Sequence, residues 1–215
     1  MIKISPSMLS ANILKLEEEV RSLDLNGADY IHIDIMDGHY VPNITFGPNI
    51  VKSLRKVTSK ILDVHLMIKP VKKYINEFVE AGSDIITFHP EADDNPEEII
   101  KMISDAEIKA GIAIHPEVNI SDIDHLFSKV QQIIVMTVTP GFGGQKFMHD
   151  QVQKIKDLDE IRKNNNYNYE IAVDGGVNNE NAKICKDNGA DVLAVGSYLL
   201  SQNQNNYYEI INSLR

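Results

Sequence analysis

The stretch from Asn26 to Gly38 reads Asn26-Gly27-Ala28-Asp29-Tyr30-Ile31-His32-Ile33-Asp34-Ile35-Met36-Asp37-Gly38 and joins a turn to a strand. Gly27 suits the position just past the end of a helix. The remainder alternates: the isoleucines form one apolar face, and His32, Asp34 and Met36 share the other. A buried histidine and carboxylate need a partner, either each other through a hydrogen bond or a metal or substrate.

The turn is repeated along the chain, which indicates a repeated structural unit. Gly27, Gly82 and Gly189 each follow a helical pattern, and each is followed two residues later by aspartate and an apolar strand. Their separations correspond to about two and four units of roughly 27 residues, a length typical of a βα repeat. Eight such units account for the 215 residues.

On this spacing the sequence predicts alternating strands and helices. The predicted strands are Lys3–Leu9, Asp29–Ile35, Lys60–Met67, Asp84–His89, Gly111–His115, Gln131–Val138, Tyr169–Asp174 and Asp191–Gly196. The predicted helices are Lys15–Leu25, Pro48–Val57, Val71–Ala81, Pro96–Ala110, Ile120–Ser128, His149–Lys163, Asn179–Asn188 and Asn203–Leu214, with a short helical piece at Tyr198–Leu200.

This alternation predicts an α/β protein with a parallel sheet, and eight units favour a closed (β/α)8 TIM barrel over an open, doubly wound sheet. We expect a single catalytic domain over residues 1–215, because 43% of the residues are hydrophobic and no change of composition divides the chain.

Charge and composition exclude several classes of function. The 31 acidic and 21 basic residues give a net charge of −10, which argues against nucleic acid or an anionic membrane surface as a partner. No stretch approaches the ~20 apolar residues of a membrane span, and the N-terminus lacks a signal-peptide core, so a cytoplasmic protein is expected. Cys185 is alone, which fits a buried structural cysteine.

Polar side chains recur at the predicted strand ends. His65 lies on one strand face with Asp63 and Met67, and Asp174 ends a later strand just before two glycines. Because TIM barrels form their sites at the carboxyl ends of the strands, we expect a site built from His32, Asp34, His65 and Asp174. Two imidazoles and two carboxylates suit one divalent cation such as Zn²⁺, Fe²⁺, Mn²⁺ or Co²⁺.

Glycine-rich segments follow the sixth, seventh and eighth predicted strands. Loops after strands seven and eight commonly bind phosphate in this fold, because backbone N–H groups there approach an anion closely. This pattern predicts a phosphate cradle of Gly176, Val177, Gly196 and Ser197, with Gly143 and Gly144 beside it. Met36, Met67 and Met136 also lie at strand ends and are interpreted either as core filling or as an apolar wall of the active site.

Seen together, the motifs resemble the ribulose-phosphate 3-epimerase family over essentially the whole chain. The segments that carry the resemblance are Ser5-Pro6-Ser7, His32-Ile33-Asp34-Ile35-Met36-Asp37-Gly38, Val41-Pro42-Asn43, Asp63-Val64-His65-Leu66-Met67, Pro140-Gly141-Phe142-Gly143-Gly144-Gln145, Asp174-Gly175-Gly176 and Gly196-Ser197. The segment from Ala113 to Asn119 departs from the family's usual loop at that place.

The resemblance implies a TIM barrel of the ribulose-phosphate-binding type that interconverts D-ribulose 5-phosphate and D-xylulose 5-phosphate in the pentose phosphate pathway. It implies one divalent metal per subunit, a homo-oligomer, and Asp34 and Asp174 as acid/base groups. By the same resemblance the metal ligands are His32, Asp34, His65 and Asp174, and the substrate-binding residues are Ser7, His65, Gly141, Phe142, Gly143, Gly144, Gly175, Gly176, Val177, Gly196 and Ser197.

The chemistry accounts for two carboxylates. Inverting C3 next to the C2 carbonyl requires a proton to leave one face and another to arrive at the opposite face, through an enediolate. Three alternatives stay open: an epimerase of a six-carbon ketose phosphate, a lyase or decarboxylase on a phosphate-binding barrel, and a metal-binding protein without activity. The second would want a lysine at a strand's carboxyl end; Lys60 begins a strand and Lys69 lies beyond one.

Overall fold

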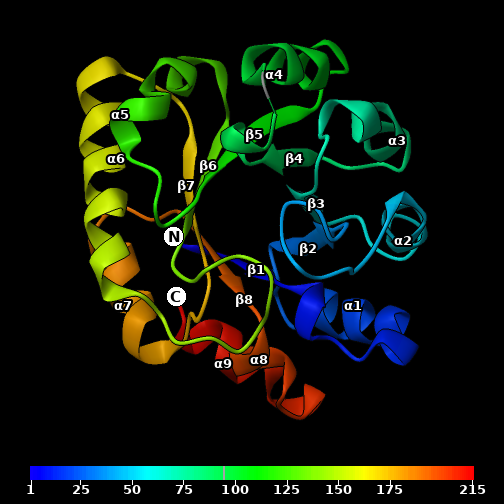
Figure 1. The fold of residues 1–215 in the computed structure, drawn as a ribbon. Helices are drawn as coiled ribbons and strands as arrows, with labels where there is room; N and C mark the ends of the chain where they lie inside the picture. The colour runs from blue at the N-terminus through cyan, green and yellow to red at the C-terminus, as the bar shows by residue number, and fades with distance from the viewer. Residues whose placement is uncertain (94) are drawn as a thin grey trace.

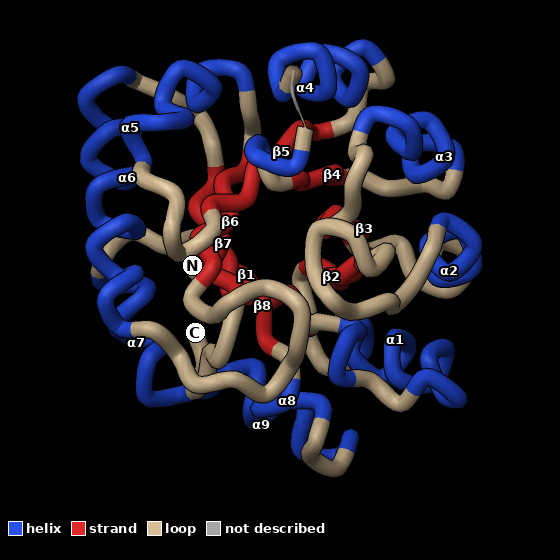
Figure 2. The backbone as a smooth tube through the Cα atoms, viewed as in Figure 1, coloured by secondary structure: helices blue, strands red, loops and turns tan. Residues whose placement is uncertain are grey.

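The structure, a computed structural model, describes residues 1–93 and 95–215. Its strands form one parallel sheet in the order β1-β8-β7-β6-β5-β4-β3-β2, which curls into a ring (Figure 2). The ring closes where Ser7, just past β1, forms a parallel bridge with His32 of β2. The strands are β1 (Lys3–Pro6), β2 (Tyr30–Met36), β3 (Ile61–Met67), β4 (Ile85–Phe88), β5 (Lys109–Ile114), β6 (Gln132–Met136), β7 (Glu170–Asp174) and β8 (Val192–Val195).

Helices surround the ring (Figure 1) and follow the strands in turn. The α-helices are α1 (Leu16–Leu25), α2 (Pro48–Leu54), α3 (Ile75–Glu80), α4 (Pro96–Asp105), α5 (Ile120–Ile123), α6 (Val152–Asn165), α7 (Asn179–Asp187), α8 (Ser197–Leu200) and α9 (Tyr207–Ser213). This architecture confirms the predicted (β/α)8 TIM barrel and excludes the open, doubly wound sheet. No helix in the described ranges combines the length and the apolar character needed to cross a bilayer.

Several predicted boundaries differ from those of the structure, and three of the differences are instructive. The helix predicted to reach Ala110 ends at Asp105, because Glu107 takes a left-handed φ of 61° and β5 already begins at Lys109. The strand predicted over Lys3–Leu9 ends at Pro6, where a 3₁₀ turn over Met8–Ser10 follows. The segment Ile120–Ser128 is α-helical for four residues and then continues as a 3₁₀ helix.

Alternate residues of most strands contribute to two different hydrophobic clusters. The isoleucines of β2 point outward and pack in the large cluster between sheet and helices. A smaller cluster fills the interior of the barrel, with Tyr30, Ile134 and Val192 among its members. Cys185 of α7 is fully buried in the outer core, as predicted, and burial raises the pKa of its thiol to about 12. The interior face of β2 is therefore free to carry His32 and Asp34 toward the barrel mouth.

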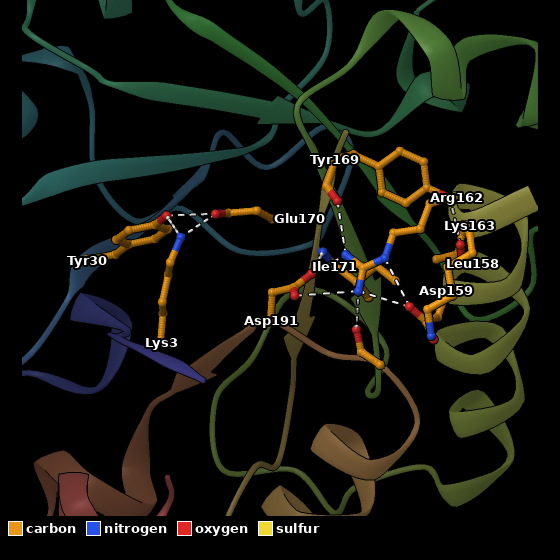
Figure 3. Close-up of polar contacts among 11 residues, drawn as sticks. Lys3, Tyr30, Leu158, Asp159, Arg162, Lys163, Tyr169, Glu170, Ile171 and Asp191 are labelled. Atoms are coloured by element: carbon orange, nitrogen blue, oxygen red, sulfur yellow. Dashed lines mark hydrogen bonds and ion pairs between the residues drawn. The ribbon is translucent and has the colours of Figure 1, made fainter. Parts of the chain in front are cut away.

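The repeated turn also has a repeated hydrogen-bonding role. Each aspartate that follows the glycine by two residues accepts a hydrogen bond, 2.8–2.9 Å long, from a backbone N–H of the preceding strand, and each pairs with an arginine. The sets are Asp29 with Ile4 and Arg215, Asp84 with Leu62 and Arg55, and Asp191 with Ile171 and Arg162. Figure 3 shows the Asp191 set. These joints therefore fix neighbouring strands in register at their amino ends.

Candidate active site

Four side chains from β2, β3 and β7 converge at the carboxyl end of the barrel. The ligand atoms of His32, Asp34, His65 and Asp174 all lie within 4.8 Å of one another. Nε2 of His32 and Nδ1 of His65 each lie 3.3 Å from Oδ1 of Asp34 and 3.6 Å from Oδ2 of Asp174. The four predicted residues are thus brought together as one compact cluster.

The charges in this cluster stabilise one another. Burial disfavours the charged form of every member, yet the neighbouring histidines hold the pKa of Asp34 well below its usual range and also lower the pKa of Asp174. The charge of Asp34 opposes ionisation of Asp174. Against the same cost of burial, the carboxylates raise the pKa values of His32 and His65. Without another cation, the imidazoles supply the positive charge that the carboxylates require.

The cluster fits a metal ion. Nε2 of His32 is buried and, within residues 1–93 and 95–215, makes no hydrogen bond, although it is one of the four ligand atoms that lie within 4.8 Å of one another. Two imidazole nitrogens and two carboxylate oxygens at this spacing form a donor set typical of divalent transition metals. The four residues can therefore hold a metal ion in place of the histidine protons.

A carboxylate contacts the ring nitrogen of His32 that faces away from the cluster. Its Nδ1 lies 2.9 Å from Oδ2 of Asp63, whose Oδ1 accepts a hydrogen bond of 2.9 Å from Nε2 of Gln132. Gly111 leaves the space for this arrangement, because a Cβ there would lie 2.2 Å from Oγ1 of Thr87 and 3.3 Å from Cβ of Gln132. The sequence placed Asp63 on this face but gave no signal for Gln132, which comes from a distant strand.

The ring of His65 has a different partner. Its Nε2 lies 3.0 Å from Nε2 of His89, which follows β4 and is fully buried. Nδ1 of His89 faces Oε1 of Glu91 at 3.4 Å, and Glu91 accepts a hydrogen bond of 2.7 Å from the hydroxyl of Tyr40. Burial, reinforced by His65, lowers the pKa of His89 to about 4.

A pocket opens over the carboxylates. Asp34 and Asp174 line it, whereas His32 and His65 lie beneath its surface and do not. The pocket is also lined by the three predicted wall methionines and by every other predicted substrate-binding residue, namely Met36, Met67, Met136, Ser7, Gly141, Phe142, Gly143, Gly144, Gly175, Gly176, Val177, Gly196 and Ser197. It is also lined by residues that the sequence analysis did not assign to the site, namely Leu9, Ser10, Val138, Pro140, Gln145 and Ala194.

Close backbone packing shapes the glycine segments. A Cβ on Gly176, whose φ is +66°, would lie 2.7 Å from the backbone nitrogen of Phe147 and 2.8 Å from the carbonyl oxygen of Gln145. A Cβ on Gly196 would lie 2.8 Å from Oγ of Ser10. The loops after β6 and β7 therefore meet at distances that only glycine permits, and the loop after β8 closely approaches the turn after β1.

Ser7 and Asn43 connect other elements to the pocket. Oγ of Ser7 donates a hydrogen bond of 2.6 Å to Oδ2 of Asp34, opposite the oxygen that faces the histidines. Nδ2 of Asn43 donates one of 2.7 Å to the carbonyl of Gly141, joining the loop after β2 to the loop after β6. Phe142 at the rim remains 56% exposed.

Solved structures with the same fold include sugar-phosphate enzymes. 3-Keto-L-gulonate-6-phosphate decarboxylase from Vibrio cholerae is 16% identical, with a TM-score of 0.74 over 100% of this chain and 95% of that one. 3-Hexulose-6-phosphate synthase from Salmonella typhimurium is also 16% identical, with a TM-score of 0.72 over 99% and 96%. At these identities the likeness shows the fold alone.

Comparison of sequences is more specific. Ribulose-phosphate 3-epimerase from Bacillus subtilis is 44% identical over 94% of each chain, and the Escherichia coli K12 enzyme of that name is 38% identical over 99% of this chain and 94% of the other. The chloroplastic ribulose-5-phosphate-3-epimerase of Arabidopsis thaliana is 40% identical over 100% of this chain and 76% of that protein. The model of the ribulose-phosphate 3 epimerase family matches residues 3–200. With the barrel and its buried cluster already in place, this match means that the chain belongs to the ribulose-phosphate 3-epimerase family.

Proposed function

We propose that the protein interconverts D-ribulose 5-phosphate and D-xylulose 5-phosphate by inverting C3, as one catalytic domain that acts in the pentose phosphate pathway. The observation that carries the proposal is that Asp34 and Asp174, from nearly opposite sides of the barrel, line one pocket within the same four-residue cluster. The names of the relatives support the choice of substrate.

Asp34 and Asp174 are the proposed acid/base pair. One carboxylate removes the C3 proton from one face, and the other carboxyl delivers a proton to the opposite face, so the pair holds one proton before and after the reaction. Ser7 holds Oδ2 of Asp34 in place and also faces the sugar.

His32, Asp34, His65 and Asp174 are the proposed ligands of one divalent cation, with Zn²⁺, Fe²⁺, Mn²⁺ and Co²⁺ as candidates. Bound there, the cation supplies positive charge that polarises the C2 carbonyl and stabilises the enediolate. The protein's own contribution is to hold the two carboxylates rigidly on opposite faces of C3 and to shield the intermediate from water with Met36, Met67 and Met136.

The proposed phosphate site is formed by the glycine segments after β6, β7 and β8. Gly176, Val177, Gly196 and Ser197 line the pocket that also contains both carboxylates. Anchoring the phosphate fixes C3 between the carboxylates.

The test is exchange of the C3 proton in deuterated water, followed by NMR. Purified protein loaded with Zn²⁺ or Mn²⁺ is expected to convert ribulose 5-phosphate into xylulose 5-phosphate that carries deuterium at C3, and removal of the metal with a chelator is expected to abolish both signals. Exchange of a six-carbon ketose phosphate, with ribulose 5-phosphate unchanged, would overturn the assignment of substrate. The absence of exchange with any ketose phosphate in folded, metal-loaded protein would refute the catalytic proposal. Mass measurement of the native protein tests the expected homo-oligomer.

A further inference from the structure

The two histidines of the cluster use different ring nitrogens and have different supports. His32 turns Nε2 toward the carboxylates and Nδ1 toward Asp63. His65 turns Nδ1 toward the carboxylates and Nε2 toward His89. The partner of the His32 ring is therefore the carboxylate of Asp63, whereas the partner of the His65 ring is the imidazole of His89.

The contact between His65 and His89 needs a defined direction. Two ring nitrogens 3.0 Å apart form a hydrogen bond only if one carries the proton and the other offers a lone pair. If His89 held its proton on Nε2, then Nε2 of His65 would have to be the acceptor and the proton of His65 would sit on Nδ1. That proton would occupy the position from which Nδ1 faces Asp34 and Asp174.

Glu91 selects the opposite arrangement. Its Oε1 lies 3.4 Å from Nδ1 of His89, a buried atom without a hydrogen-bond partner in the described part of the chain. At this distance a protonated Nδ1 is attracted to the carboxylate, whereas a lone pair would be repelled by it. Tyr40 donates a hydrogen bond of 2.7 Å to the same oxygen, and its ring contacts that of His89 in a tilted arrangement, with 4.6 Å between ring centroids.

We propose that Tyr40, Glu91 and His89 are positioning residues that keep the proton of His65 on Nε2 and so leave its Nδ1 free for a metal ion. The inference rests on the proposed metal role of the four-residue cluster, but not on the substrate. It gives a function to His89 and Glu91, which lie outside the set of ligands and do not line the pocket. Groups that orient metal-binding histidines in this way commonly contribute 10–100-fold to metal affinity.

The first measurement is the tautomeric state of the histidines in the zinc-loaded wild-type protein, read from long-range ¹H–¹⁵N NMR spectra. We expect His65 to bind through Nδ1 and to carry its proton on Nε2, and His89 to carry its proton on Nδ1. His32 should show the opposite pattern, with zinc on Nε2. Zinc on Nε2 of His65, or a proton on Nε2 of His89, would overturn the proposal without any variant having to fold.

The second measurement is zinc affinity by competition with a chromophoric chelator. His89→Phe keeps an aromatic ring but removes the acceptor, so we expect the Kd for zinc to rise on the order of 10–100-fold. His89→Gln restores an acceptor through its amide oxygen and should recover most of this loss. Glu91→Gln, whose amide oxygen can still face Nδ1–H, should bind zinc more tightly than Glu91→Leu.

His125→Phe is the matched control, because its side chain is 52% exposed and lies in the 3₁₀ segment Asp124–Lys129, away from the cluster. Equal zinc affinity in His89→Phe and His125→Phe would refute the proposed positioning role of His89. A wild-type protein that shows the expected tautomers and zinc affinity but no C3 exchange would refute the proposed function without contradicting the positioning role of Tyr40, Glu91 and His89.

Discussion

At the residue scale, Asp34 is the more constrained of the two carboxylates in the four-residue cluster. Oδ1 faces both histidines at 3.3 Å, Oδ2 accepts the hydrogen bond of Ser7, and only 3% of the residue is exposed. Asp174 is more open, with 15% of its side chain exposed. Two carboxylates with different surroundings are suited to opposite proton-transfer roles in one reaction.

This asymmetry leads to a prediction for single-carboxylate variants. Asp34→Asn and Asp174→Asn should each lower kcat by about 10²–10⁴-fold, because each removes one of the two proposed proton-transfer groups. Each variant should still replace the C3 proton of one of the two epimers with solvent deuterium, but not that of the other. NMR of each substrate incubated separately in deuterated water measures this incorporation. Metal content, determined in parallel, separates loss of proton transfer from loss of the metal.

Asp187→Asn is the control for these variants, since Asp187 is 55% exposed and pairs with Lys183 on the surface of α7. It should retain wild-type activity. Variants of Asp34 and Asp174 that lose exchange from both epimers equally would argue against two separate bases.

Gly176 carries the prediction for the phosphate site. Gly176→Ala combines a left-handed φ of +66° with a Cβ that would lie 2.7 Å from the backbone of Phe147, so the loops after β6 and β7 must separate. We expect KM for ribulose 5-phosphate to rise on the order of 10-fold with a smaller change in kcat, measured by steady-state kinetics. Gly27→Ala has a similarly left-handed φ of +93° but open space around the new methyl, so its KM should stay unchanged.

The residues of the site could be predicted where local patterns carried them. His32, Asp34, His65 and Asp174 stand at strand ends or on the polar face of an alternating strand, and the fold rule then brought them together. Gln132 and Tyr40 could not be found in this way. Gln132 reaches Asp63 only through the closed ring, and Tyr40 lies in a loop without periodicity. Their contacts depend on tertiary packing across 51 to 69 residues of sequence.

At the element scale, the alternation of strands and helices could be predicted, and their ends less well. The glycine turns marked where three strands begin, because each glycine, which adopts a positive φ, and the aspartate two residues later can be recognised in the sequence. The end of α4 had no such signal, because Glu107 adopts a positive φ without being glycine. The 3₁₀ turns at several helix starts were also missed, since 3₁₀ and α-helices share nearly the same hydrophobic spacing.

Arg162 allows the role of these joints to be tested. It extends from α6 to Asp191, Asp159 and the carbonyls of Tyr169 and Gly189, the last two at 3.1 and 3.0 Å (Figure 3). Arg162→Met should lower the free energy of unfolding by roughly 2–4 kcal/mol in urea titrations, because it leaves partly buried acceptors unpaired.

Arg21→Met is the comparison for this variant. Arg21 forms an exposed i,i+4 pair with Glu17 on α1, a contact worth only about 0.3–0.5 kcal/mol. If the two arginine variants lost similar free energies, the joints would not be the elements that hold the amino ends of β7 and β8 together.

At the scale of the whole molecule, the barrel separates stability from chemistry. The carboxyl ends of the strands hold the pocket, while the amino ends of three strands meet in a polar cluster of Lys3, Tyr30 and Glu170 (Figure 3). The hydroxyl of Tyr30 accepts a hydrogen bond of 3.0 Å from Nζ of Lys3 and donates one of 2.8 Å to Glu170. The cluster ties β1 and β2 to β7 across the interior of the barrel, next to the place where the ring closes.

This cluster predicts how the stability of the barrel depends on alkaline pH. Burial, together with the carboxylate of Glu170, raises the pKa of Tyr30 to about 12 from its usual 10, and contacts with Glu170 and Tyr30 raise that of Lys3 against the cost of burial. Between pH 10 and 12 the folded protein keeps the Tyr30 proton that the unfolded chain releases. The contribution of Tyr30 to stability is therefore full below pH 10 and is lost as the pH rises.

Tyr30→Phe should reduce the slope of stability against pH by about one proton, or ~1.4 kcal/mol per pH unit, in urea titrations at successive pH values. Tyr208→Phe is the control, because this tyrosine is 61% exposed, and it should leave the slope unchanged. Equal slopes in the wild type and Tyr30→Phe would show that this cluster does not control the alkaline stability of the barrel.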